Sequence, residues 1–337
     1  MKALVLKQPG EAAVQEIRDP ANLGDSLLLK VRRVGLCGSD LNSFRGTNPL
    51  VGYPRILGHE VAATIVVGSN SDAALSAGVN VTMSPYTSCG VCASCRRQRP
   101  NACQSNQTLG VQRDGALTEF ITMPASKLYP SRLGLTELCL VEPLTVGFHS
   151  AARGRITSAD TVAVMGCGGV GLGAIAASHF SAARTIGIDI DDVKLGVARK
   201  AGADDTINAK REALHARLLE LTDGLGPDVF IEAIGSPETF RCAVEEVAFT
   251  GRVVYIGYAK TPVTYESRLF VQKELDILGS RNALPEDFRQ VIRMLEAGNF
   301  PVSDAVTTIA PLQEVPRLLQ EWNQNPGRFS KIMVDVS

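Results

Sequence analysis

The chain has 337 residues, with 34 lysine and arginine residues against 35 aspartate and glutamate residues and a net charge of −1. Bulk electrostatics therefore does not draw it to nucleic acid or to an anionic membrane, and we expect neither partner. We find no signal core and no run near the roughly 20 apolar residues that cross a bilayer, so we expect a cytoplasmic protein. The length favours two domains.

Eight cysteines without an export signal are expected to be reduced thiols, which can act as metal ligands or as small buried side chains. Disulfides are the weaker alternative. The 31 glycines, spread between many short apolar runs, are typical of a globular α/β enzyme.

The first part of the chain, to about Pro130, consists of short apolar runs separated by turn residues, which predicts a mostly β domain. The strands that we predict there are Ala3–Leu6, Leu27–Val34, Ala62–Val67, Val79–Met83 and Leu117–Met123.

From about Thr161, apolar runs typical of buried parallel strands alternate with helical segments, which predicts a doubly wound parallel sheet. We predict helices at Asp191–Lys200 and Pro237–Val247. After Gly279 the regular alternation of predicted strands and helices ends. We predict a helix near Glu286–Ala297, and this last part of the chain can complete the first domain. The predicted parallel strands are Thr161–Met165, Thr185–Asp189, Thr206–Ile207, Val229–Ile234, Arg252–Ile256 and Leu275–Leu278.

A glycine-rich turn directly follows the strand Thr161–Met165 and leads into the apolar helical stretch Leu172–Phe180. In this position its glycines allow the backbone to approach a pyrophosphate, which then meets the free N–H groups of the helix. Such a motif by itself is weak evidence, because glycine turns also arise for packing reasons, but the strand and helix around it favour a dinucleotide site. The turn consists of Gly166, Cys167, Gly168, Gly169, Val170 and Gly171.

Asp189 ends the next predicted strand, about 20 residues on, where a carboxylate can accept both ribose hydroxyls of the cofactor. This charge would repel a 2′-phosphate, so the sequence favours NAD over NADP. The alternative is an ordinary strand-end or helix-capping carboxylate. Lys194 is a candidate contact near the adenine, or else a solvated helix lysine.

Four of the eight cysteines fall within 15 residues, at Cys89, Cys92, Cys95 and Cys103. Four thiolates close a tetrahedral shell around zinc and leave no position for a substrate, so this pattern predicts a structural zinc site. An iron–sulfur cluster is the alternative, but the spacing does not match the usual ferredoxin patterns.

Several motifs together resemble the zinc-dependent medium-chain dehydrogenase/reductase family over nearly the whole chain. Within this family the chain is similar to the sorbitol, threonine and sugar-acid dehydrogenases, and in particular to L-galactonate 5-dehydrogenase-type enzymes. The motifs occur in the family's order: GLCGSD at Gly35–Asp40, GHE at Gly58–Glu60, the four cysteines, EPL at Glu142–Leu144 and GCGGVG at Gly166–Gly171.

The resemblance implies a GroES-like, mostly β catalytic domain formed by residues 1–147 and 279–337, and a Rossmann NAD-binding domain formed by residues 148–278. It also implies two zinc ions per chain, one catalytic and one structural, NAD as cofactor, and a homo-oligomer, either a dimer or a tetramer. The substrate is then a small alcohol, a polyol or a sugar acid.

By motif position, the resemblance implies that Cys37 and His59 bind the catalytic zinc together with a carboxylate from Glu60 or Glu142. Which glutamate binds is left open. In a regular strand His59 and Glu60 would point to opposite faces, so both can reach one metal only where the backbone bends, and Gly58 permits such a bend.

The mechanism that we expect has zinc lowering the pKa of the substrate hydroxyl as a Lewis acid, after which the alkoxide transfers hydride to the nicotinamide. Ser39 would take the hydroxyl proton and pass it on through the cofactor ribose; alternatively, it caps a helix that begins near Asp40. The family commonly has histidine five residues after the zinc cysteine. Here the residue is Asn42, which cannot titrate, so water or another residue must complete the proton route.

Further contacts are expected at the ends of the later strands, where Ile256, Gly279 and Arg281 are candidates for the cofactor. Arg281 and Asn282 lie where polyol dehydrogenases place polar substrate contacts, and an arginine can pair with a sugar-acid carboxylate. Other substrate candidates, each also readable as a surface side chain, are Arg45, Tyr53 and Arg113.

Together these features predict a zinc-dependent oxidoreductase that transfers a hydride from a secondary alcohol, a polyol or a sugar acid such as an aldonate, to NAD. A threonine or simple alcohol dehydrogenase is the first alternative. A zinc-free quinone or enoyl reductase and a non-catalytic NAD-sensing protein are further alternatives.

Overall fold

The computed structural model describes residues 1–21, 26–69 and 72–336. The chain divides into two compact units, and one division point lies inside helix α3 (Leu135–Gly154), between Glu142 and Pro143. Unit 1 comprises Met1–Glu142, Leu284–Glu296 and Val302–Ser337; unit 2 comprises Pro143–Ala283 and Ala297–Pro301. The assignment of residues 1–147 and 279–337 to a catalytic domain, and of residues 148–278 to a cofactor domain, remains a prediction.

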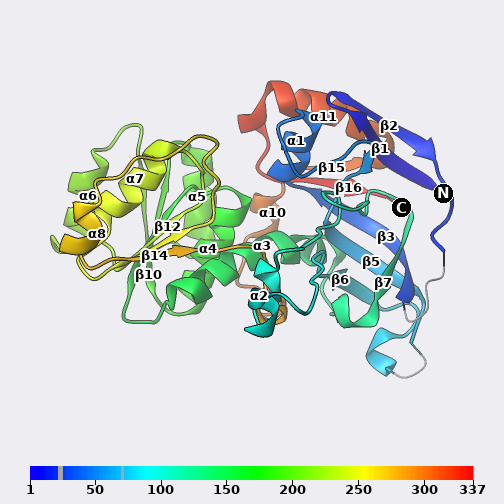
Figure 1. Ribbon diagram of the computed structural model, residues 1–337, viewed down its shortest axis with the longest axis horizontal. Helices are drawn as coiled ribbons and strands as arrows, with labels where there is room; N and C mark the ends of the chain where they lie inside the picture. Colours follow the sequence, from blue (N-terminus) through cyan, green and yellow to red (C-terminus); the bar gives the residue numbers. More distant parts are fainter. Residues whose placement is uncertain (22–25, 70–71, 337) are drawn as a thin grey trace. The chain divides into compact units, whose positions relative to one another are not determined.

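Unit 1 is built around two β-sheets (Figure 1). In the larger sheet the last strand of the chain pairs antiparallel with β3, which brings the C-terminal segment next to the first motif. The smaller sheet has the order β2 (Glu11–Glu16), β1 (Lys2–Gln8), β4 (Arg55–Ile56). The larger has the order β15 (Thr308–Pro311), β16 (Ile332–Asp335), β3 (Ser26–Leu36), β5 (Glu60–Val67), β6 (Asn80–Met83), β8 (Leu128–Pro130), with β7 (Phe120–Pro124) also paired to β3.

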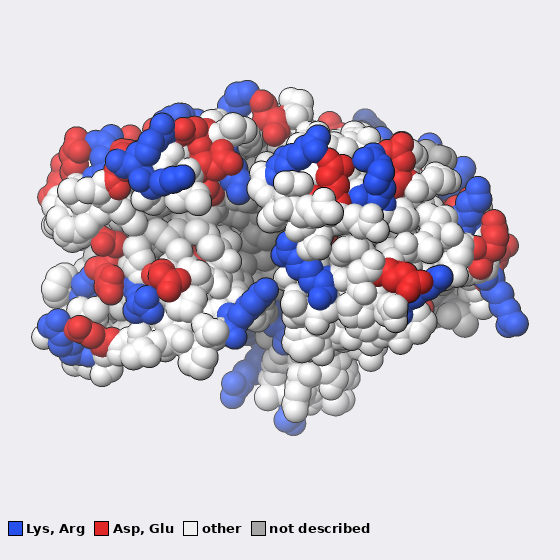
Figure 2. Space-filling model, turned by 90° about the horizontal axis from the view of Figure 1, so that it is seen from above, with Lys and Arg blue, Asp and Glu red and all other residues white. Residues whose placement is uncertain are grey.

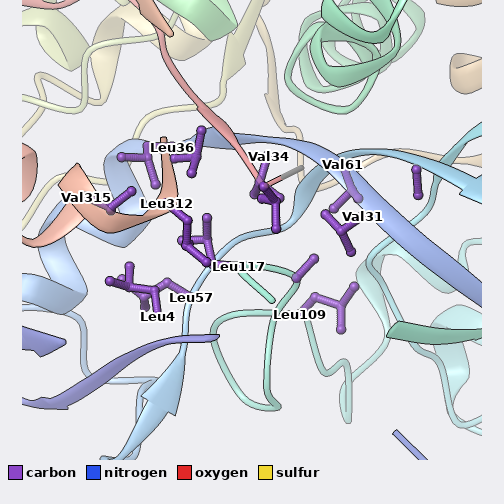
Figure 3. Close-up of a cluster of buried hydrophobic side chains, with 14 of the residues drawn as sticks. Leu4, Val31, Val34, Leu36, Leu57, Val61, Leu109, Leu117, Leu312 and Val315 are labelled. Carbon is purple, nitrogen blue, oxygen red and sulfur yellow. The ribbon is translucent and has the colours of Figure 1, made fainter. Parts of the chain in front are cut away.

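The core of unit 1 is a single apolar cluster that draws on both ends of the chain (Figure 3). Strand β3 contributes Val31, Val34 and Leu36, and α11 (Val315–Gln324) contributes Leu318, Leu319 and Trp322 from one face. Burying a leucine of this kind stabilises the fold by about 1.5–3 kcal/mol. The cluster therefore fixes β3, and with it the chain that leads to Cys37.

Short helices complete unit 1. Besides α11 and the first part of α3, the described α-helices of this unit are α1 (Gly38–Phe44), α2 (Ala93–Arg96), α9 (Pro285–Glu296) and α10 (Val302–Ala305). Helix α9 buries Phe288, whose ring stacks on Tyr129 with centroids 4.6 Å apart.

Unit 2 contains a six-stranded sheet in which the strands are all parallel. The strand order reverses between β9 and β12, and in such sheets ligands bind at the carboxyl ends of the strands at this point. The order is β11 (Asp205–Asn208), β10 (Arg184–Asp189), β9 (Thr161–Met165), β12 (Val229–Glu232), β13 (Arg252–Tyr255), β14 (Asp276–Gly279).

Two helices of unit 2, α5 and α7, begin at residues whose side chains cap them. Asp191 accepts the N–H of Val193 at the start of α5, and Ser236 accepts the N–H of Thr239 at the start of α7, with Pro237 in the first turn. The helices are α4 (Gly169–Phe180), α5 (Asp192–Lys200), α6 (Leu214–Leu221), α7 (Pro237–Glu246) and α8 (Arg268–Gln272).

Most predicted strands differ from the structure by one or two residues at an end, and two of these differences are informative. The strand expected over Leu117–Met123 begins at Phe120, and the strand expected over Val229–Ile234 ends at Glu232. The second ends early because the Glu232 carboxylate accepts the N–H groups of Ile234 and Gly235, which turns the chain.

Helix α3 was not predicted. Pro143 lies inside it, and proline and glycine both disfavour a helix interior. Gly147 is nevertheless required, because a Cβ there would lie 2.1 Å from the backbone nitrogen of Ala174 in α4. Close packing of the two helices therefore outweighs local preference.

The described residues include no helix that is both long enough and apolar enough to span a membrane. On the face drawn in Figure 2, acidic and basic side chains are interspersed, in keeping with the near-zero net charge.

Candidate metal and cofactor sites

Three potential metal ligands from two segments meet in unit 1. Cys37 precedes α1, His59 precedes β5, and Glu60 is the first residue of β5. One ligand atom from each, a thiol sulfur, a ring nitrogen and a carboxylate oxygen, lie within 4.8 Å of one another. His59 and Glu60 are buried and Cys37 is half-buried. This donor set is one that zinc binds in catalytic sites.

The backbone turns sharply just before His59. Gly58 has a φ of +96°, a backbone conformation that residues other than glycine rarely adopt, and β5 begins only at Glu60. A Cβ at Gly58 would also lie 2.7 Å from Cγ1 of Val34. His59 is thus outside the regular alternation of the strand, which explains how two consecutive side chains both approach Cys37.

Asp40 connects the two segments. Its Oδ2 accepts the N–H of Cys37 at 2.9 Å, and its Oδ1 accepts the N–H of Gly58 at 3.3 Å and lies 4.0 Å from Nδ1 of His59. Burial raises the pKa of Asp40, and His59 opposes this shift. Asp40 therefore holds the backbone of Cys37 at a fixed position relative to His59.

Glu60 is anchored by a buried lysine from the far end of the chain. Nζ of Lys331 lies 2.6 and 2.7 Å from the two carboxylate oxygens of Glu60, and 3.3 Å from the carbonyl oxygen of Leu36. Burial disfavours the charged lysine, but Glu60 and Cys37 outweigh burial and raise the pKa of Lys331 to about 12. A Cβ at Gly35 would lie 2.0 Å from Oε2 of Glu60, so the glycine makes room for this carboxylate.

The second candidate glutamate, Glu142, occupies a different position. It lies buried in α3, and its Oε1 accepts a hydrogen bond from the Tyr86 hydroxyl. Burial, and then the charge of Glu142, raise the pKa of Tyr86 well above its usual value. Among the described residues, the group of close ligand atoms contains Glu60 and not Glu142.

Two buried polar atoms beside this group have no hydrogen-bond partner, namely Nδ1 of His59 and Oγ of Ser39. Burial opposes protonation of His59, but Asp40, Cys37 and Glu142 together outweigh it and raise the pKa of His59 well above its usual value. An unsatisfied buried polar atom costs about 1–3 kcal/mol. The free atoms and the donor set fit a metal ion, and three protein ligands would leave the fourth position of a tetrahedral zinc for another ligand.

Ser39 lies in the first turn of α1, whose N-cap is Cys37. The alternative that Ser39 caps a helix beginning near Asp40 is therefore wrong. Asn42 lies in the same helix, and its Oδ1 accepts the Thr47 hydroxyl at 3.4 Å. A proton route from Ser39 remains a prediction.

The four-cysteine segment brings its sulfur atoms together, and all four lie within 4.8 Å of one another. The Sγ separations are 3.5 Å for Cys92 and Cys95, 3.9 Å for Cys92 and Cys103, and 3.6 Å for Cys103 and Cys89. Sulfurs about 2.3 Å from one tetrahedral zinc lie about 3.8 Å apart. An iron–sulfur cluster distributes its cysteines over several irons, so these spacings favour a single ion.

Nearby polar groups favour the thiolate form of Cys89 and Cys92, whereas burial raises the pKa of Cys95 to about 11. The Ser94 hydroxyl lies 3.1 Å from Sγ of Cys92, and this contact, followed by backbone N–H groups, lowers the pKa of Cys92 to about 5. The N–H groups of Cys89 and Ser105 each donate to Sγ of Cys103 at 3.3 Å. Thiolates are the form in which cysteines bind metal.

In unit 2 the glycine-rich turn lies at the carboxyl end of β9 and opens α4. Gly166 has a φ of +98°, and a Cβ at Gly171 would lie 1.6 Å from the carbonyl oxygen of Gly166. At Gly168, by contrast, a Cβ would meet no atom within 4 Å. Two glycines are thus required by the fold, whereas Gly168 borders open space, which fits close approach by a cofactor.

Asp189 holds this turn in place. Its Oδ2 accepts the N–H of Cys167 at 2.8 Å, and its Oδ1 accepts the N–H groups of Ile190 at 2.8 Å and Asp191 at 3.1 Å. The helix cap of α5 is Asp191, so the alternative of Asp189 as a helix cap is wrong. Burial, and then Asp189, raise the pKa of Cys167, while Lys194, which lies in α5, opposes the shift.

The other cofactor candidates lie at the carboxyl ends of the last two strands. Ile256 follows β13, and its N–H donates to the carbonyl oxygen of Glu232 at 2.9 Å. Gly279 ends β14 and accepts a hydrogen bond from Arg153 at 3.1 Å. Arg281 and Asn282 follow after Ser280, and Asn282 has a φ of +52°.

The three remaining substrate candidates differ in what they contact. Arg45 donates to Asn323, at 2.7 Å to Oδ1, and the Tyr53 hydroxyl donates to the carbonyl oxygen of Ser43 at 2.6 Å. Within the described part of the chain, the Arg113 side chain donates to the carbonyl oxygen of Pro85, at 3.4 Å. Among the described residues no carboxylate pairs with Arg113, and its side chain makes fewer hydrogen bonds than that of Arg45.

Lys331 and Tyr86, which bind the two candidate glutamates, were not predicted from the sequence, and no role was predicted for Asp40. Asp40 stands in the GLCGSD motif and could have been found there. Lys331 is 271 residues from Glu60, so no local spacing connects them. A lysine at the start of an apolar strand is a weak signal for a buried ion pair.

Two family models match this chain, an alcohol dehydrogenase GroES-like domain over residues 24–132 and a zinc-binding dehydrogenase domain over residues 169–297. An uncharacterized zinc-type alcohol dehydrogenase-like protein of Haemophilus influenzae is 33% identical and covers 98% of each chain. L-galactonate-5-dehydrogenase of Escherichia coli is 29% identical over 91% of each chain, and sorbitol dehydrogenase of Bacillus subtilis is 31% identical over 99% of this chain and 97% of its own.

Solved structures give the same result. An alcohol dehydrogenase from Escherichia coli in complex with NADH superimposes with a TM-score of 0.91 at 28% identity and covers 100% of this chain and 99% of its own. A zinc-binding dehydrogenase from Sinorhizobium meliloti bound to NADP has a TM-score of 0.91 at 26% identity, with 99% of each chain covered.

The chain therefore belongs to the zinc-dependent medium-chain alcohol dehydrogenase family, as its motifs predicted. It is an oxidoreductase acting on CH–OH groups, in a branch whose relatives include sorbitol, L-threonine and L-galactonate dehydrogenases. The predicted fold class, a GroES-like sheet domain and a Rossmann-like parallel-sheet domain, is confirmed.

Proposed function

We propose that this protein transfers a hydride from a secondary alcohol of a polyol or a sugar acid, such as an aldonate, to NAD. The observation that carries the proposal is the group of Cys37, His59 and Glu60, which presents a catalytic zinc donor set in a protein of this family. The galactonate and sorbitol dehydrogenases among its relatives support this substrate class.

In this proposal Cys37, His59 and Glu60 hold the catalytic zinc. When bound, zinc supplies the Lewis acidity that lowers the pKa of a hydroxyl group. Asp40 fixes the backbone of Cys37 and Gly58, and Lys331 orients the Glu60 carboxylate. Glu142, held by Tyr86, remains available as an alternative carboxylate.

Ser39 is the residue that we propose to accept the substrate proton. Its Oγ is buried and free of competing hydrogen bonds, so it can take a proton from a hydroxyl placed beside it. Asn42 cannot relay the proton onward by titration, so we propose that water completes the route.

The dinucleotide would bind at the carboxyl ends of β9 and β10, with Gly168 next to the pyrophosphate and Asp189 at the adenosine ribose. NAD supplies the hydride acceptor. We propose NAD over NADP because the Asp189 carboxylate would repel a 2′-phosphate, although relatives bound to NADH and to NADP are both known. Lys194, Ile256, Gly279 and Arg281 are the further contacts that we propose.

Substituting Gly168 by alanine is expected to weaken NADH binding by about tenfold or more, because the new methyl group would occupy the space next to the turn. Thermal stability should be unchanged, since Gly168 has an ordinary φ of −76° and no close neighbour. Calorimetric titration with NADH measures the effect.

The matched control for Gly168→Ala is Gly171→Ala, whose Cβ meets the carbonyl oxygen of Gly166. This change should lower stability by about 1–3 kcal/mol through overpacking. Unaltered NADH affinity in Gly168→Ala would remove the turn from the cofactor site.

A screen of NAD and NADP reduction tests the proposed reaction. Polyols, aldonic acids, threonine and simple alcohols are offered with and without a chelator, and absorbance of the reduced cofactor is recorded. We expect turnover with a polyol or an aldonate and its loss when the metal is removed. Turnover of threonine or a simple alcohol alone would favour the first alternative. Metal-independent turnover would favour a zinc-free reductase, and cofactor binding without turnover a sensing protein.

Arg113 is expected to contribute to binding if the substrate is a sugar acid. Its guanidinium lies against Pro85, next to Tyr86, and burial lowers its pKa without a carboxylate that compensates. Changing Arg113 to methionine should raise the KM for aldonates about tenfold or more, because a charged hydrogen bond contributes about 1.5–3 kcal/mol. Steady-state kinetics across the screen measures this.

Neutral polyols serve as the internal comparison, and their KM should change little in Arg113→Met. The control variant is Arg317→Met, which removes an exposed arginine paired with Glu314 and Glu321. Equal losses for charged and neutral substrates would contradict a role of Arg113 in carboxylate recognition.

Metal content and assembly complete the proposal. We propose two zinc ions per chain, one at Cys37, His59 and Glu60 and one at the four cysteines, and we propose a dimer or tetramer by likeness to the family. Elemental analysis and light scattering on the purified protein measure both.

A further inference from the structure

A buried glutamate in unit 2 lies at the edge of the sheet where the strand order reverses. Glu232 ends β12, which pairs with β9 so that Glu232 stands beside Met165, the residue before the glycine-rich turn. Glu232 is 0% exposed. An acidic side chain is almost never fully buried without partners, so its contacts require an explanation.

One carboxylate oxygen of Glu232 accepts hydrogen bonds from residues that follow β12 and are no longer part of the sheet. Oε1 accepts the N–H of Ile234 at 2.8 Å, the N–H of Gly235 at 2.7 Å and the hydroxyl of Thr239 at 2.8 Å. Oε2 is buried and has no partner. The carboxylate therefore shapes the turn formed by residues 233–236.

That turn packs directly on the glycine-rich turn. The N–H of Ala233 donates to the carbonyl oxygen of Met165 at 2.9 Å. A Cβ at Gly166 would lie 2.7 Å from Cγ1 of Ile234, and one at Gly171 would lie 3.7 Å from Cβ of Ala233. Residues 233–236 thus form one wall of the turn to which the pyrophosphate would bind.

The same glutamate also contacts the segment after β13. Its carbonyl oxygen accepts the N–H of Ile256 at 2.9 Å and of Gly257 at 3.3 Å. A Cβ at Gly257 would lie 2.4 Å from the nitrogen of Gly235 and 2.5 Å from Oε2 of Glu232. Only glycine fits there, so the segment after β13 packs closely on Glu232 and on the turn that its carboxylate shapes.

We propose that Glu232 is a positioning residue for the dinucleotide, which fixes the turn of residues 233–236 against the glycine-rich turn. The inference rests on the proposed function, because it requires that unit 2 bind a dinucleotide. Without the carboxylate, the N–H groups of Ile234 and Gly235 lose their acceptor, and the cofactor must order this wall when it binds.

The variant that tests this role is Glu232→Met, which keeps a side chain of similar length and removes the acceptor. We expect the Kd for NADH to rise about tenfold or more, since hydrogen bonds to a charged group are lost. The KM for NAD should rise in parallel while kcat at saturating NAD stays within about twofold. Glu232→Gln keeps one acceptor oxygen and should restore most of the affinity.

Two comparison variants separate positioning from general stability. Asp228 precedes the other end of β12 and accepts the N–H of Thr161 at 2.8 Å, so Asp228→Leu should lower thermal stability without changing the Kd for NADH. Thr239→Val removes a single donor to Glu232 and should raise the Kd about threefold. It keeps the test decisive if Glu232→Met does not fold.

Calorimetric titrations with NADH and NADPH give the outcome. An unchanged Kd in folded Glu232→Met, or in Thr239→Val when Glu232→Met does not fold, overturns the inference and leaves the proposed function intact. If the unaltered protein binds neither dinucleotide, the proposed function fails and the inference fails with it.

Discussion

Replacing Cys37 by serine is expected to lower kcat/KM for alcohol oxidation by about a thousandfold or more. The thiolate is one of the three donor groups proposed to hold the catalytic zinc, and Lewis-acid stabilisation contributes several kcal/mol, each 1.36 kcal/mol being a factor of ten. NADH binding should be unchanged because the glycine-rich turn belongs to unit 2. Steady-state kinetics, NADH titration and elemental analysis measure the three effects.

Cys242→Ser is the matched control for Cys37→Ser. Cys242 lies half-buried in α7 and belongs to neither group of potential ligands. It should retain activity and both zinc ions, whereas Cys37→Ser should retain only the zinc of the four-cysteine segment. Activity that survives in Cys37→Ser would remove this thiol from the site.

Replacing Lys331 by methionine is expected to lower the free energy of unfolding of unit 1 by about 3–5 kcal/mol in the metal-free protein. The change leaves the Glu60 carboxylate fully buried without its cation, and breaking one partner of a buried ion pair is costly for this reason. The single tryptophan, Trp322, lies in the core of unit 1, so its fluorescence during urea denaturation follows this unit.

Lys7→Met is the control, since Lys7 pairs with Glu11 on the surface at 3.4 Å with both side chains about half exposed. This pair should contribute less than about 1 kcal/mol. The double variant Glu60→Gln with Lys331→Met should recover part of the loss, because it removes the unpaired charge. Similar losses for Lys7→Met and Lys331→Met would show that the buried pair has no special role in stability.

The predicted bounds are most accurate for strands that have a clear apolar pattern between turn residues. The strand Thr161–Met165 has the predicted bounds, because a short apolar run after a turn and before glycines has few alternatives. Where side chains from elsewhere intervene, the expectation is less accurate. The strand at Val229 ends two residues early because Glu232 binds the N–H groups beyond it, and α3 forms despite Pro143 because it packs against α4 in unit 2.

The candidate site shows the same division. The motifs predicted Cys37, His59 and the two candidate glutamates as zinc ligands. The bend at Gly58 followed from the geometry of a strand. The choice between the glutamates did not follow from the sequence. In the structure Glu60 lies with Cys37 and His59, whereas Glu142 is bound to Tyr86.

The sequence by itself therefore determined the family, the two kinds of sheet and the residue types available for zinc and a dinucleotide, because these depend on spacing along the chain. Only the tertiary structure revealed that Lys331 pairs with Glu60 and that a side chain at Gly168 would meet no other atom. These depend on which distant segments pack together, and the burial of many apolar side chains decides that packing. A single lysine 271 residues from its partner carries no local signal.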